Sequence, residues 1–131
     1  MKIRGLLLGL SLFTAVGTAL YWILVFTGLL PVDEIVPGYT TWYWSFPLPD
    51  SWIVVTATLT AFAIIKKRDA MAITFGLLTA ASMIFLALNE INFSLHTGMT
   101  LSEMGINLAI KAYCLIVGTF FIAQFSKQIK R

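Results

Sequence analysis

The chain has 131 residues, of which 59% are hydrophobic and 11% are charged, and its mean hydropathy is +0.88. This composition is too apolar for an ordinary soluble domain of this length, and it predicts an all-α integral membrane protein. The net charge of +3 does not require a nucleic-acid partner, because the basic residues are distributed as they are in polytopic membrane proteins.

Four membrane spans are expected, at about residues 5–30, 49–65, 70–97 and 101–125, as a single four-helix domain. A helix needs about 20 apolar residues, at 1.5 Å each, to cross the bilayer core. The start of the first stretch resembles a secretory signal, but its apolar run continues to Leu30, which favours an uncleaved span. The second stretch is short, so we expect it to begin near Pro49, with Lys66 and Lys67 snorkelling at its other end.

The placement of the basic residues predicts the orientation of the four spans. Eight of the nine lysine and arginine residues fall on one side of the predicted topology: Lys2, Arg4, Lys66, Lys67, Arg68, Lys127, Lys130 and Arg131. The positive-inside rule makes this side cytoplasmic. We therefore expect both termini in the cytoplasm and a prokaryotic plasma membrane as the location.

The connection between the first two spans, Pro31 to Asp50, is long and holds all four prolines and the aromatic run Tyr39–Trp44. Together with Tyr21 and neighbouring tryptophans it forms an aromatic belt at the outer interface. One interpretation is simple anchoring in the lipid headgroup region. The other is a lid over a pocket between the helices, since loops of this length are often functional. Asp50 is predicted to cap the second helix, as Asp69 is the third.

The last two spans are expected to meet in a short hairpin. Gly98 is a helix stop, and Thr100-Leu101-Ser102-Glu103 fits a capping box that starts the next helix at Leu101. Antiparallel folding about this turn would place His96 opposite Glu103.

Two polar stripes would then meet deeper in the same hairpin. Asn92 would face Asn107, and Asn89 or Glu90 would lie level with Lys111. A lysine inside an apolar helix is costly, so it is usually paired and often functional. The alternative is structural, with polar side chains hydrogen-bonding between helices and Lys111 snorkelling to the interface.

The functional interpretation is a polar pocket that opens outward and binds a small or amphipathic ligand, with translocation as an extension of that role. Its expected ligand-binding residues are Asn89, Glu90, Asn92, Asn107, Lys111, Asp50, Trp44 and Tyr21. Thr14 and Thr18 lie at helical spacing with Tyr21 and could add a fourth wall.

Two other classes of function remain open. The chain could be an accessory subunit, or form a homo-oligomer, because Gly5-x-x-x-Gly9 and Gly76-x-x-x-Ala80 are close-packing faces for this bundle or for another subunit. It could also be a small enzyme that acts on a lipid-like substrate through Glu90 and Lys111.

Catalytic and metal-binding signals are thin. The chain has no nucleophile elbow, phosphate-binding loop or dinucleotide fingerprint. A single histidine, His96, excludes a multi-histidine metal site, and the single Cys114 excludes a Cys-x-x-Cys redox enzyme. We therefore expect no metal and no cofactor, and we favour binding over catalysis.

Overall fold

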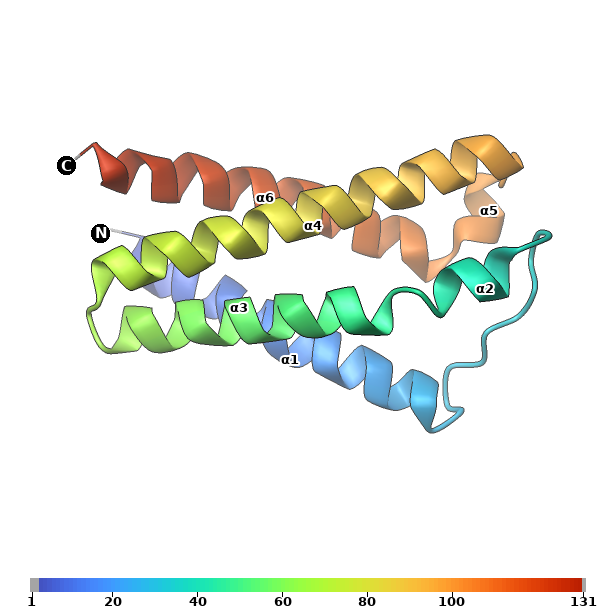
Figure 1. Ribbon diagram of the computed structural model, residues 1–131, viewed down its shortest axis with the longest axis horizontal. Helices are drawn as coiled ribbons and strands as arrows, with labels where there is room; N and C mark the ends of the chain where they lie inside the picture. Colours follow the sequence, from blue (N-terminus) through green and yellow to red (C-terminus); the bar gives the residue numbers. More distant parts are fainter. Residues whose placement is uncertain (1–2, 131) are drawn as a thin grey trace.

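The structure is a computed structural model that describes residues 3–130. It consists of six helices: α1 (Arg4–Phe26), α2 (Tyr39–Tyr43), α3 (Pro47–Ile65), α4 (Asp69–Thr97), α5 (Leu101–Met104) and α6 (Ile106–Ile129). The four long helices run antiparallel along the bundle, and α2 and α5 lie at the end remote from both termini (Figure 1). Four spans, with α2 and α3 counted together, are long and apolar enough to cross a membrane, as the composition predicted.

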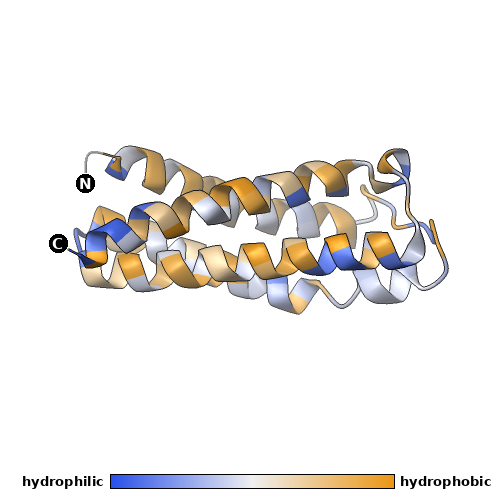
Figure 2. Ribbon diagram, turned by 90° about the horizontal axis from the view of Figure 1, so that it is seen from above, coloured by the Kyte–Doolittle hydropathy of each residue, from blue (hydrophilic) through white to orange (hydrophobic). Residues whose placement is uncertain are grey.

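The long helices pack in the order α1, α3, α4, α6. Each packs against the next, whereas α1 and α6 make hardly any backbone contact. The bundle therefore consists of two helical hairpins, α1–α3 and α4–α6, joined by the tight turn at residues 66–68. Hydrophilic residues lie at the end that carries the termini and also on helices in the other half of the bundle, while apolar residues cover much of the sides (Figure 2).

The helix bounds differ from the predicted spans at two places. The first helix ends at Phe26 rather than near residue 30, because the chain turns at Thr27 and Gly28, whose φ is +80°. The fourth span is divided, since α5 stops after one turn and Gly105, with a φ of +50°, redirects the chain into α6. Glycine tolerates these positive φ values without a steric penalty.

The predicted turn between α4 and α6 is confirmed. Gly98 ends α4 in the left-handed conformation, with a φ of +67°. Thr100 and Glu103 form both halves of the capping box, with the Glu103 amide donating to Thr100 Oγ1 at 3.3 Å and the Thr100 amide donating to Glu103 Oε2 at 2.8 Å. These bonds satisfy backbone groups that the start of a helix leaves unpaired.

The caps expected at Asp50 and Asp69 are wrong. Helix α3 begins at Pro47, whose fixed φ suits the first helical position and which has no amide hydrogen to cap. Helix α4 begins without a side-chain cap. Both aspartates lie in the first turns of their helices and bind other helices instead, Asp50 to Trp22 and Asp69 to Arg4.

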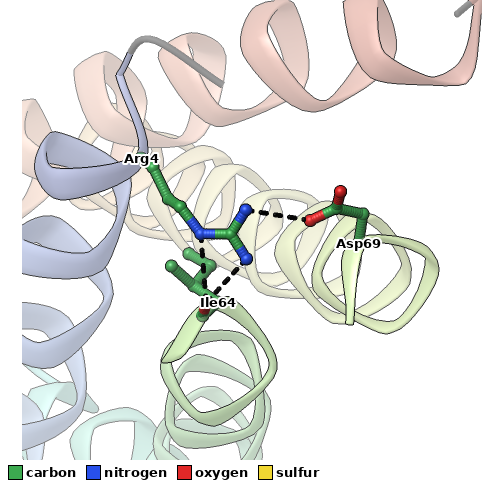
Figure 3. Close-up of polar contacts among 3 residues, drawn as sticks. All are labelled: Arg4, Ile64 and Asp69. Atoms are coloured by element: carbon green, nitrogen blue, oxygen red, sulfur yellow. Dashed lines mark hydrogen bonds and ion pairs between the residues drawn. The ribbon is translucent and has the colours of Figure 1, made fainter. Parts of the chain in front are cut away.

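Arg4 ties three helices together at the end that carries the termini (Figure 3). Its Nε and one Nη donate to the carbonyl oxygen of Ile64 at 3.1 and 2.7 Å, and its other Nη lies 3.2 Å from Asp69 Oδ1. The Ile64 carbonyl belongs to the last turn of α3, where backbone acceptors lack helical partners. Arg4 therefore caps α3 from α1 and also pairs with the start of α4.

Small residues let α4 and α6 approach closely. A Cβ on Gly76 would overlap the ring of the fully buried Phe125, and a Cβ on Gly118 would lie 2.8 Å from Ile84 Cγ1. The close-packing face predicted at Gly76 is thus used inside the bundle. A Cβ on Gly5 or Gly9 would have no neighbour within 4 Å, so the packing predicted for these two glycines within the bundle is wrong.

Candidate functional site

A cavity of about 360 Å³ lies between all four long helices, in the half of the bundle remote from the termini. Helix α2 covers it toward that end. Its walls come from α1 (Phe13, Thr14, Gly17, Thr18, Tyr21, Trp22), the α2 region (Trp42, Tyr43, Phe46), α3 (Asp50, Ile53), α4 (Met83, Leu86, Ala87, Glu90) and α6 (Ile106, Asn107, Ala109, Ile110, Lys111, Tyr113, Cys114). The cavity therefore combines an apolar surface with a few polar groups, as ligand-binding cavities commonly do.

Seven aromatic side chains contribute to this wall. Helix α2 supplies part of them and is joined to its neighbours by hydrogen bonds: the hydroxyls of Tyr21 and Tyr43 bind each other, and Asn107 Nδ2 donates to Tyr39 OH at 2.7 Å. The rings of Trp22 and Tyr43 also pack at 5.4 Å between centroids. The outer loop is thus held over the cavity by α1 and α6.

The Asp50 carboxylate lines the cavity on α3. Trp22 Nε1 donates to its Oδ2 at 2.7 Å, which links α1 and α3 and leaves Asp50 with a partner in the wall. Such a bond stabilises a carboxylate that is largely removed from water.

The Glu90 carboxylate is different, because its Oε2 is buried and has no hydrogen-bond partner. Within residues 3–130, the indole Nε1 of Trp42 is the other buried side-chain polar atom without a partner. Both residues line the cavity, and the Trp42 ring is fixed by stacking on Phe93 at 4.1 Å between centroids. Buried polar atoms are normally bonded, so these two mark a place where a ligand group would be stabilised.

Lys111 is buried, with 6% of its surface exposed. Its Nζ donates to Ser94 Oγ at 3.3 Å and approaches Met104 Sδ at 3.8 Å. Arg4–Asp69 is the one ion pair in the described part of the chain, so the expected pairing of Lys111 with Glu90 is not formed. Within residues 3–130, Glu90 and Lys111 therefore line the same cavity without touching each other.

Asn89 and Asn92 do not line the cavity, and both are exposed on the outer face of α4 together with His96. Their expected place in the pocket is wrong. The inward face of α4 instead carries Ala80, Met83, Ala87, Glu90 and Ser94. Successive residues in a helix are about 100° apart, so turning Glu90 inward turns Asn89 outward.

Two predicted contacts of the hairpin are also wrong. His96 makes no hydrogen bond or ion pair with Glu103, whose carboxylate is held by the Thr100 amide. Asn107 binds Tyr39 of α2 rather than Asn92. Glu103 binds a backbone amide of its own cap, and Asn107 binds an aromatic hydroxyl, in place of the partners on α4 that the sequence predicted.

Trp44, expected in the pocket, is 44% exposed and packs against the ring of Phe26 at 5.7 Å between centroids. Trp42 lines the cavity wall where Trp44 was expected. The two tryptophans lie two residues apart on a short helix, so they point in opposite directions.

The cavity reaches the seam between α1 and α6. Thr14 Oγ1 and Tyr113 OH lie 2.7 Å apart across it, and the rings of Phe13 and Tyr113 pack at 5.5 Å. Phe13 lines the cavity and is also 64% exposed on the outside of the bundle. Only a thin layer of side chains therefore separates the cavity from the surrounding lipid at this place.

Of the predicted site residues, Tyr21, Asp50, Glu90, Asn107 and Lys111 lie together in the cavity wall, and so do Thr14 and Thr18. Tyr113 and Cys114 also line it, although the sequence did not lead us to expect them there. Continuing the stripe of Asn107 and Lys111 by three residues reaches Cys114, so helical spacing could have found this face.

No group of three His, Cys, Asp or Glu side chains in residues 3–130 could hold a metal ion. No family model, curated protein or solved structure matches the chain. Function must therefore be inferred from the residues of the site itself.

Proposed function

We propose that the protein binds a small amphipathic ligand in the cavity between its four long helices. The observation that carries this proposal is the buried Glu90 Oε2, which has no partner although it lines an apolar cavity of about 360 Å³. Leaving a polar atom unpaired in such a place is costly, and ionisable groups inside membrane helices are commonly functional. The volume lies at the lower end of the range typical of small-molecule sites.

The arrangement of polar and apolar surface supports an amphipathic ligand. Aromatic and aliphatic side chains form most of the wall, whereas Asp50, Glu90 and Lys111 supply charge. The thin seam at Phe13 and Tyr113 offers a path from the bilayer. A ligand that partitions into lipid could therefore reach the cavity sideways, and a release on the other face of the membrane would make the protein a transporter.

Native mass spectrometry of the protein extracted with its lipids tests the proposal. Gly17 lines the cavity and has nothing within 4 Å of a Cβ, so a side chain can start there and Gly17→Leu would take up space in the cavity. Gly9→Leu is the matched control, because Gly9 lies two turns away on α1, has equally free surroundings and does not line the cavity. A bound mass is expected with the natural protein and with Gly9→Leu, and it should be lost with Gly17→Leu.

Retention of the same mass by Gly17→Leu would place the ligand outside the cavity and contradict the proposal. The proposal would also be contradicted if the natural protein carried no bound molecule and took up none from a library of amphiphiles. Melting curves of the three proteins must accompany the spectra, because a loss caused by unfolding would also lower the melting temperature.

We also propose that both termini are cytoplasmic, that the cavity lies toward the outer leaflet and that the membrane is a prokaryotic plasma membrane. The support is the charge distribution: the start of α1, the turn at residues 66–68 and the end of α6 carry most of the basic residues and lie at one end of the bundle. A fluorescent protein fused to the C-terminus should fluoresce, and a phosphatase fused there should be inactive. A dark fluorescent protein and an active phosphatase would instead show that the C-terminus lies outside the cytoplasm.

A second candidate function, an accessory subunit, is favoured by one separate observation. Asn89, Asn92 and His96 form an exposed polar stripe on α4, facing away from the bundle. Polar side chains on membrane helices often hydrogen-bond to a neighbouring helix. Cysteine crosslinking from Asn92→Cys in native membranes should then yield a discrete larger product, and an uncrosslinked chain would weigh against this function.

A further inference from the structure

On the basis of the proposed binding function, we infer that the ligand is an organic cation, such as a substituted ammonium ion, whose charge is held by Glu90 and whose apolar part lies against the aromatic wall. Three features of the cavity lead to this ligand class: its charge, the placement of its lysine and the chemistry of its rings.

The charges that line the cavity do not balance. Two carboxylates, Asp50 and Glu90, face one ammonium group, Lys111, which gives a formal charge of −1 when all three are ionised. A buried charge without a counter-ion is strongly unfavourable, so a cation that enters this space is stabilised by it. An anionic ligand would instead add to the excess negative charge.

The lysine does not form an ion pair with Glu90. Its Nζ is held by Ser94 and Met104 at the end of the cavity near α5, and it forms no ion pair with any acidic residue of the range 3–130. Asp50, in contrast, already accepts a hydrogen bond from Trp22. Among the described residues, Glu90 Oε2 is therefore the buried side-chain acceptor that has no partner.

The rings of the wall suit a cation with apolar substituents. Tyr21, Trp22, Trp42 and Tyr43 have electron-rich rings and line the same cavity as Glu90. Substituted ammonium ions bind to such rings through cation–π interactions, which are strongest with tryptophan and strengthen when water is excluded. The stacking of Trp42 on Phe93 and the bond of Trp22 to Asp50 fix two of these rings in place before a ligand binds.

Competition binding tests this inference with two isosteric probes. Radiolabelled benzyltrimethylammonium is equilibrated by dialysis with the full chain in lipid nanodiscs. Unlabelled competitors are benzyltrimethylammonium itself, neopentylbenzene, in which carbon replaces the charged nitrogen, and the anion benzylsulfonate. Only the cation is expected to displace the label, because the three molecules are of similar size and differ chiefly in charge.

Three variants assign the binding to Glu90. Glu90→Gln should weaken binding of the labelled cation at least about thirtyfold, the loss typical of removing one partner of a buried charge pair. Asp33→Asn removes a carboxylate from the exposed outer loop and should leave the affinity unchanged. Lys111→Met removes the competing positive charge and should increase the affinity severalfold, which provides a second reading if Glu90→Gln fails to fold.

Displacement of the label by neopentylbenzene as readily as by the cation would overturn the ligand class but leave the cavity as a binding site. Unchanged binding of the labelled cation in both Glu90→Gln and Lys111→Met would also overturn the ligand class and leave the cavity as a binding site. A natural protein that binds none of the probes, together with no bound mass in the native spectra, would overturn both this inference and the proposed function.

Discussion

The hydroxyls of Thr14 and Tyr113 lie 2.7 Å apart and join α1 to α6. These helices are the first and the last of the bundle, and they make hardly any other close backbone approach to each other. The bond lies at the edge of the cavity, next to the exposed ring of Phe13. It is therefore the polar contact that closes the thinnest part of the cavity wall.

Tyr113→Phe removes this bond and keeps the ring. We expect both association and dissociation of benzyltrimethylammonium to become faster, with a smaller change in its Kd, because the seam opens more readily while Glu90 and the rings are untouched. Stopped-flow tryptophan fluorescence measures the two rates. Phe120→Leu, a change on α6 outside the cavity wall, is the control, and equal rates in natural protein and Tyr113→Phe would exclude the seam as the path.

Gly76→Ala should destabilise the bundle by about 1–2 kcal/mol. The added methyl group overlaps the ring of Phe125, which is fully buried, and overpacking costs more than the gain in helix propensity. Gly9→Ala adds the same methyl group to open space and should be neutral or slightly stabilising. Thermal unfolding of both variants in the same detergent measures the difference, which would vanish if α4 and α6 were loosely packed.

The contacts of Arg4 predict unequal effects of two substitutions. Arg4→Ala should lower the unfolding free energy by about 1–2 kcal/mol, because the Ile64 carbonyl loses both of its bonds to the guanidinium. Asp69→Asn removes only an exposed ion pair and should cost less than about 0.5 kcal/mol. Unfolding in increasing denaturant gives both values, and equal losses would mean that the ion pair dominates.

Glu34 should hold the start of α2 in a pH-dependent manner. The hydroxyl of Thr40 donates to its carboxylate, and this bond together with nearby backbone amides lowers the pKa of Glu34 below its usual value. Because the folded pKa is lowered, the stabilisation is present at neutral pH and is lost as the pH falls through the lowered value. Tryptophan fluorescence of the outer loop should change at that point.

Glu34→Gln is the control for this transition. The variant cannot ionise, so its fluorescence should show no corresponding change in the acidic range. A transition that persists in Glu34→Gln would assign the effect to another carboxylate.

Most of the fold could be predicted from the sequence, since long apolar stretches and clustered basic residues suffice to place four helices. The turn between α4 and α6 was also predictable, because the capping box at Thr100 and Glu103 and the stop at Gly98 are local signals. The end of α1 was not, because residues 27–30 continue the apolar run of the helix before them and only the positive φ of Gly28 ends it.

The site was harder to predict, because the polar residues of α4 do not mark its inner face. Close packing on α6 requires small residues such as Gly76 and Ala80, and this requirement turns Glu90 inward and Asn89 outward. Lys111 lies in the cavity wall, but the partners of its ammonium group were not predictable. Ser94 reaches it from α4, and Met104 reaches it from α5, which the break at Gly105 separates from α6.

The seam between α1 and α6 also differs from the other edges of the bundle in its connectivity. The long outer loop crosses from α1 to α3, the turn at residues 66–68 crosses from α3 to α4, and residues 98–105 cross from α4 to α6. Within residues 3–130, no covalent segment crosses from α6 to α1. An opening of the cavity between α1 and α6 would therefore not require any connecting loop to stretch, because in the described part of the chain the two hairpins are covalently joined only between α3 and α4.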